Sequence, residues 1–143
     1  MEKKAFYFSR GAFFGGTLLT TIYTLLNDND HVVLEMRPAN LFRKMKRYEF
    51  IMPITEMERL ARIIASIRDW KPQYKNERRI LDGYGWSLEY HFGDLDFQSH
   101  GYMCFPENYK EKVSELQTII EEFCLKYAPD GYDMGDREER INL

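Results

Sequence analysis

Residues 84–101 read YGWSLEYHFGDLDFQSHG, an alternation of apolar and polar side chains that is typical of two antiparallel strands. The two-residue turn Gly93-Asp94, with glycine first, suits a type II′ reversal and fixes the register of the hairpin. The facing residues are then paired as Phe92 with Leu95, Tyr90 with Phe97 and Trp86 with Gly101. We expect this side of the hairpin to face the core, with Trp86 covering the gap at Gly101.

The other side of the hairpin is polar. The same register places His91 beside Asp96, with Glu89 and His100 on the same sheet face. A histidine next to a carboxylate can serve as a general base, and three such side chains can hold a metal ion. A solvated sheet face carries the same residues, and a His–Asp pair across two strands is favourable without any reaction. We therefore assign no catalytic or metal-binding residue and treat His91, Asp96 and His100 as candidate binding residues.

Four more strands are expected before the hairpin, at residues 5–10, 17–26, 31–37 and 47–52. Residues 17–26 also fit a helical period, but four threonines and Tyr23 favour a strand.

Two helices complete the expected fold. The first follows Pro53, with Thr55 and Glu58 spaced as a capping box, and ends near Trp70. The second begins near Pro106, since proline is favourable in a first helical turn. The sequence therefore predicts an α+β fold, with a single mostly antiparallel sheet of five to six strands and two helices packed on one face.

Two aromatic residues, Phe13 and Phe14, stand between glycines in the segment GAFFGG at residues 11–16. The glycines permit a sharp reversal of the chain, which would leave both rings at its tip as an exposed binding surface. The alternative is that the pair folds back into the core.

The 143 residues, of which 44% are hydrophobic and 15% aromatic, suit one folded domain spanning residues 1–143. The formal net charge is −3, but residues 1–79 carry 15 Lys and Arg against 9 Asp and Glu, while residues 80–143 carry 5 against 14. We expect the two halves to attract each other across the fold. An acidic total argues against a nucleic-acid partner, and the basic run at residues 43–47 is interpreted as a solvated loop, with a small phosphate-facing patch as the alternative.

The two cysteines, Cys104 and Cys124, lack the spacing of a metal or redox motif, so we expect reduced thiols in a cytoplasmic protein. Cys104 lies at a strand-to-helix junction, where a nucleophile can be found, but it also suits a small buried hydrophobic position. Phosphate-loop, nucleotide-binding and serine-hydrolase motifs are absent. The uncharged run at residues 11–26 is too short for a membrane-spanning helix and has no obvious cleavage site after it, so we expect no membrane attachment.

Three segments resemble a group of small uncharacterised bacterial proteins: LDGYGWSL at residues 81–88, Gly101-Tyr102, and PENY at residues 106–109. The group has an Asp-Gly-x-x-Trp strand, a glycine ending the next strand and a Pro-x-Asn-aromatic entry to a closing helix. It commonly has an asparagine where this chain has Met103. The resemblance implies a bacterial or phage origin and an α+β fold, and it implies no activity. The physical reading of the residues agrees, since Asn108 can serve the first turn of the closing helix.

These observations favour a non-enzymatic protein-binding module that docks through its open sheet face or through Phe13 and Phe14, to another protein or to a second copy of itself. No cofactor is expected. The alternative is a small hydrolase or metal-dependent enzyme that uses His91, Asp96, Glu89 and His100.

Overall fold

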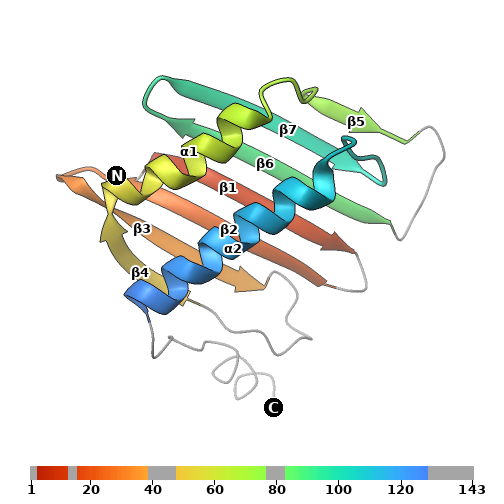
Figure 1. Cartoon of the computed structure of the whole chain (residues 1–143). Coiled ribbons are helices and arrows are strands. Elements are labelled where there is room, and N and C mark those ends of the chain that lie inside the picture. The colour runs from red at the N-terminus through yellow and green to blue at the C-terminus, as the bar shows by residue number, and fades with distance from the viewer. Residues whose placement is uncertain (1–2, 13–15, 39–47, 77–82, 129–143) are drawn as a thin grey trace, which may run out of the picture.

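A seven-stranded sheet forms the centre of the computed structural model, which describes residues 3–12, 16–38, 48–76 and 83–128 (Figure 1). Within these residues the strand order across the sheet is β4-β3-β2-β1-β6-β7-β5. The strands are β1 (Lys3–Ala12), β2 (Gly16–Leu25), β3 (Asp28–Pro38), β4 (Tyr48–Pro53), β5 (Gln73–Lys75), β6 (Tyr84–Phe92) and β7 (Leu95–Tyr102). The helices are the 3-10 turn η1 (Ile54–Glu56), α1 (Met57–Ser66) and α2 (Tyr109–Tyr127).

The expected α+β class, with one sheet and two helices, is confirmed, but the expected five to six strands are too few. The described residues contain a seventh strand, β5, which pairs with β7 in parallel, so the sheet is mixed. Strand β5 has three residues, and Tyr74, the middle one, is the only one that is partly buried. Three residues are too few to show the alternation by which a strand is predicted from sequence.

The hairpin of β6 and β7 has the expected register, since Phe92 faces Leu95 and Trp86 faces Gly101. Gly93 has a φ of 62°. Among the described residues the one non-glycine residue with a positive φ is Met103, so the φ of Asp94 is negative. A positive φ at the first turn position alone is the mark of the predicted type II′ turn. The strand expected at residues 17–26 is confirmed as β2, which ends one residue earlier, at Leu25.

Both helix starts differ from the expected ones. The capping box is wrong: Glu56, not Thr55, occupies the N-cap of α1, and no side chain caps the helix there, because the chain first makes the 3-10 turn η1 after Pro53. Helix α2 begins at Tyr109, three residues after Pro106. Asn108 occupies its N-cap without capping it. The Oδ1 atom of Asn108 instead accepts a hydrogen bond of 2.9 Å from Trp70 Nε1, which joins the start of α2 to the segment after α1.

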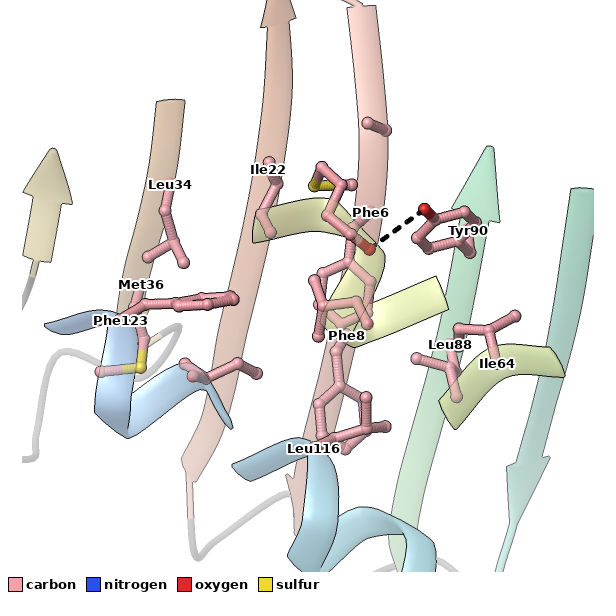
Figure 2. Close-up of a cluster of buried hydrophobic side chains, with 14 of the residues drawn as sticks. Phe6, Phe8, Ile22, Leu34, Met36, Ile64, Leu88, Tyr90, Leu116 and Phe123 are labelled. Atoms are coloured by element: carbon pink, nitrogen blue, oxygen red, sulfur yellow. Dashed lines mark hydrogen bonds between the residues drawn. The ribbon is translucent and has the colours of Figure 1, made fainter. Parts of the chain in front are cut away.

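The core lies between the sheet and the two helices, which cover the same face (Figure 1). Figure 2 shows side chains of both helices lying against the strands, with Leu116 of α2 close to Phe8 of β1. Tyr90 is buried, and its hydroxyl donates a hydrogen bond of 3.5 Å to the carbonyl of Met57. Burial of each such large side chain stabilises the fold by roughly 1.5–3 kcal/mol.

The two helices run over the sheet in opposite directions (Figure 1). Helix α1 carries the chain from β4 at one edge to β5 at the other, and α2 returns in the opposite direction. At the end of α2, the ring of Tyr127 lies 6.3 Å from that of Phe50 in β4, and its hydroxyl donates to Glu56 at 2.7 Å. Arg59, near the start of α1, pairs with Glu122 in the second half of α2, an attraction between the basic and acidic halves of the chain. The opposite face of the sheet has no helix over it in the part of the chain that the structure describes.

Candidate functional site

The polar side of the hairpin brings three of the four expected residues together. Nδ1 of His91 contacts Oδ1 of Asp96, and Nε2 of His91 lies 3.3 Å from Oε1 of Glu89. The His91 side chain is 31% exposed and that of Asp96 is 84% exposed, so solvent reaches the pair. The hydrogen bond with Asp96 raises the pKa of His91; partial burial lowers it, and Glu89 raises it further.

His100 does not join this cluster. It faces Ser87 in β6 and Gln73 in β5, four residues along β7 from Asp96. At about 3.3 Å per residue, its backbone lies roughly 13 Å away. Among the described residues, no group of three His, Cys, Asp or Glu side chains could hold a metal ion. The cluster is therefore a histidine between two carboxylates.

This arrangement is poorly suited to proton transfer. A histidine base uses one ring nitrogen for its orienting carboxylate and needs the other for the substrate. Both ring nitrogens of His91 face carboxylates instead, so neither is left for a reacting group. The geometry is that of a cross-strand ion pair on a sheet surface.

The face of the sheet that the helices leave uncovered, the open face, is divided into an apolar and a polar part. Because side chains alternate along a strand, this face carries the residues between the buried ones. Strands β6 and β7 contribute Glu89, His91, Gln98 and other polar residues. Strands β1 to β4 contribute a set that we call the apolar patch: Tyr7, Leu19, Tyr23, Val33 and Ile51.

Three of the five residues of the apolar patch lie side by side, whereas Tyr7 faces Thr21 and Leu19 faces Arg37. Tyr23 faces Val33, and Val33 faces Ile51, which forms one row across β2, β3 and β4. Ile51 is 59% exposed, while the other four patch residues are half-buried by their neighbours. Charged residues surround the patch: Lys4 lies 4.6 Å from the Tyr7 ring, and Arg37 pairs with Glu35 at 3.0 Å.

The sequence itself carries a signal for this patch. In the strand expected at residues 31–37, the alternation that turns Val32 and Leu34 inward places Val33 outward, where a polar residue is expected. An apolar residue on the solvent side of several neighbouring strands indicates an interaction surface.

Other candidate residues do not enter the site. Phe13, Phe14 and the basic run 43–47 lie outside the described residues. Cys104 and Cys124 are both free thiols, and no hydrogen bond joins the Cys104 thiol to a base within the described part of the chain. Burial raises the pKa of Cys124 to about 11, so this thiol is unreactive in the folded protein.

No helix in the described ranges combines the length and the apolar character that spanning a membrane requires.

Comparison of the chain with protein-family models, with curated proteins and with solved structures found no match.

Proposed function

We propose that this protein is a non-enzymatic protein-binding module that docks its partner on the open face of the sheet. The apolar patch supports this proposal. It places aliphatic and aromatic side chains from four neighbouring strands on a face that no described helix covers. An apolar patch of this kind on a small domain marks an interaction surface.

The chemistry of the partner follows from the composition of the patch and its surroundings. Protein interfaces have a core rich in tyrosine and aliphatic residues and a polar rim. Here Tyr7, Tyr23 and Ile51 form such a core, and the rim carries both charges, as in Lys4 and Glu49. A phosphate backbone would favour a uniformly basic surface, whereas a protein surface with its own apolar centre and mixed rim fits this one.

Site-specific crosslinking tests the proposal. A photoreactive amino acid is placed at position 51, or at position 125 as a control, and the tagged protein is purified from its native host after irradiation. Leu125 is the matched control because it is 73% exposed on α2, on the other side of the sheet. We expect a discrete crosslinked partner at position 51 and none at position 125.

Two point variants complete the test. Ile51→Lys is expected to abolish capture of that partner, while Leu125→Lys retains it. Equal crosslinking at both positions, or capture that survives Ile51→Lys, would show that the open face is not the docking surface. A crosslink between two copies of the chain would identify the partner as the protein itself.

The alternative function, a small hydrolase or metal-dependent enzyme at the hairpin, has one supporting observation, the contact between His91 and Asp96. We rank it second because both ring nitrogens of His91 face carboxylates and because His100 lies four residues from Asp96 along β7. Hydrolysis of an activated ester that His91→Gln abolishes would reverse this ranking.

A further inference from the structure

A second site lies on the helix-covered side of the sheet, at the end of β1. The alternation of β1 places Arg10 on the same face as Phe6 and Phe8, beneath α2, where an apolar residue is expected. The guanidinium carbon lies 5.7 Å from the centre of the Phe8 ring. Nη2 donates a hydrogen bond of 2.7 Å to Oε1 of Gln117 in α2.

The charge of Arg10 has no direct counterpart among the residues that the structure describes. Among the described residues no carboxylate lies within ion-pair distance of it, and its Nε is buried without a hydrogen-bond acceptor. A buried arginine N–H that lacks an acceptor costs free energy, and a bound anion would remove that cost. Gln117 fixes the guanidinium in place, because its own Nε2 is held by Glu121 at 3.3 Å.

Arg10 opens into a cavity of about 790 Å³ between the start of β6, the loop before α2 and α2 itself. This volume lies within the range of small-ligand sites, roughly 300–1,000 Å³. Three aromatic residues line it: Tyr84, Phe105 and Tyr109. The rings of Phe105 and Tyr109 are 4.8 Å apart, and Phe105 is 39% exposed at the surface.

The polar groups of the cavity limit the charge of its ligand. Besides Arg10, the charged lining residues are Lys110, Glu107 and Glu121, so the positive and negative charges cancel. A ligand with one negative charge matches the single fixed guanidinium. The second negative charge of a dianion would be repelled by the two glutamates. The hydroxyls of Tyr84 and Tyr109 lie 3.2 Å apart and offer a further donor to an oxygen-bearing group.

We propose that this cavity binds a monocarboxylate attached to an aromatic body, with the carboxylate on the Arg10 guanidinium and the ring against the aromatic wall formed by Tyr84, Phe105 and Tyr109. A small aromatic acid and the free C-terminus of a peptide ending in an aromatic residue share this chemistry. The site lies on the opposite side of the sheet from the apolar patch, so it does not depend on the proposed function.

Matched acids and amides test the proposal by NMR titration of the whole chain. The first pair of probes is 3-phenylpropionate and 3-phenylpropionamide, and the second is the N-acetylated tripeptide Ala-Ala-Phe with a free or an amidated C-terminus. We expect the two acids, at millimolar concentration, to shift the side-chain signals of Arg10 and Gln117, and the neutral amides to leave them in place. The acid that binds more tightly identifies the source of the natural ligand.

Three variants assign the binding to the cavity. Arg10→Gln is expected to weaken the acids by about tenfold or more, because it removes a charged hydrogen-bond donor. Arg59→Gln, which changes an arginine of α1 outside the cavity, leaves affinity unchanged. Phe105→Ala is expected to weaken binding while leaving Arg10 in place. Because Phe105 is partly exposed, this variant should fold, and it keeps the test valid if Arg10→Gln does not fold.

The proposal is overturned if neither acid binds, if the amides bind as well as the acids, or if Arg10→Gln retains the affinity of the unaltered chain. Failure here leaves the crosslink expected at position 51 unaffected, so the two proposals are tested separately.

Discussion

At the scale of single residues, Trp86 and the carbonyl of Cys104 both approach Gly101 closely. A Cβ atom at Gly101 would lie 2.5 Å from both Trp86 Nε1 and the carbonyl of Cys104, which hydrogen-bond to each other at 3.0 Å. Gly101→Ala is therefore expected to destabilise the protein by about 1–3 kcal/mol. Gly85→Ala is the control, since its Cβ would meet Tyr102 at an ordinary 3.6 Å, and it should change stability by at most about 0.5 kcal/mol. Urea denaturation measures both, and equal losses would contradict this role of Gly101.

Met103 holds a left-handed backbone conformation, with a φ of 51°, that side chains disfavour. Its amide donates to the Tyr84 carbonyl at 2.8 Å and its carbonyl accepts from Asn76 at 2.9 Å, which hold the conformation in place. Met103→Gly is thus expected to be more stable than Met103→Ala by about 1 kcal/mol, because both variants lose the same side chain and glycine alone relieves the strain. At Gln98, in regular strand, the order of the two variants should be reversed. Thermal or urea unfolding of the four variants decides the matter.

His91 should make stability depend on pH. Its pKa in the folded protein is raised by Asp96, whereas the unfolded value is about 6.5. Its contribution is therefore fully present below about pH 6.5 and is lost as the pH rises through the higher folded value. Relative to His91→Gln, the unaltered protein should lose up to about 1 kcal/mol between pH 5.5 and 8.5, a small effect because the pair is exposed. NMR titration should show the pKa of His91 falling in Asp96→Asn, and an unchanged value would exclude this pair as its cause.

Sequence reasoning was most successful for residues whose role depends on strand alternation and a short turn. The pairing of Trp86 with Gly101 and of His91 with Asp96 followed from the register that Gly93-Asp94 imposes. The φ of Met103 and the exposure of Arg10 to a cavity depend on how distant elements meet, so no local pattern reports them.

At the scale of elements, the contact between Trp70 and Asn108 links the two helices. Asn108→Ala is expected to destabilise the protein by about 1–3 kcal/mol, because the Nε1 of Trp70, a buried residue, loses its acceptor. Asn108→Asp keeps an oxygen acceptor and should recover most of that loss. The control is Ser66→Ala, which removes an exposed hydrogen bond to the Ile63 carbonyl and should cost at most about 0.5 kcal/mol.

Asn108→Ala also tests whether Asn108 links the two helices or caps the start of α2. If Asn108 acted as an ordinary N-cap, its loss would lower the helix content of α2 without affecting Trp70. We expect instead that tryptophan fluorescence changes in Asn108→Ala, since Trp70 packs against Tyr109 and Trp86.

Element positions were harder to predict than element types. The strands and both helices were found where apolar periodicity is strong, but the start of α1 moved because η1 intervenes after Pro53, and β5 was missed because three residues carry no period. Strand β5 forms because the chain, after α1, reaches the free edge of β7. This edge exists only in the assembled sheet, so the local sequence does not indicate the strand.

At the scale of the whole molecule, the two faces of the sheet differ in burial, and under the proposed function they also differ in role. Leu34 and Val33 are neighbours in β3, yet Leu34 is fully buried under the helices and Val33 lies on the open face beside Ile51. Leu34→Ala is expected to cost about 2–5 kcal/mol, because it leaves a cavity in the core. Ile51→Thr keeps a β-branched residue on an exposed strand position and should cost at most about 0.5 kcal/mol.

The same Ile51→Thr variant should nevertheless weaken partner capture, because it removes apolar area from the centre of the proposed interface. A residue that matters for binding and not for folding is the signature of a docking surface. If Ile51→Thr instead lost as much stability as Leu34→Ala, the patch would be covered within the folded chain, and the open face would have no apolar surface to offer a partner. Urea denaturation and capture from the native host, carried out on the same two variants, therefore separate a surface reserved for a partner from an extension of the core.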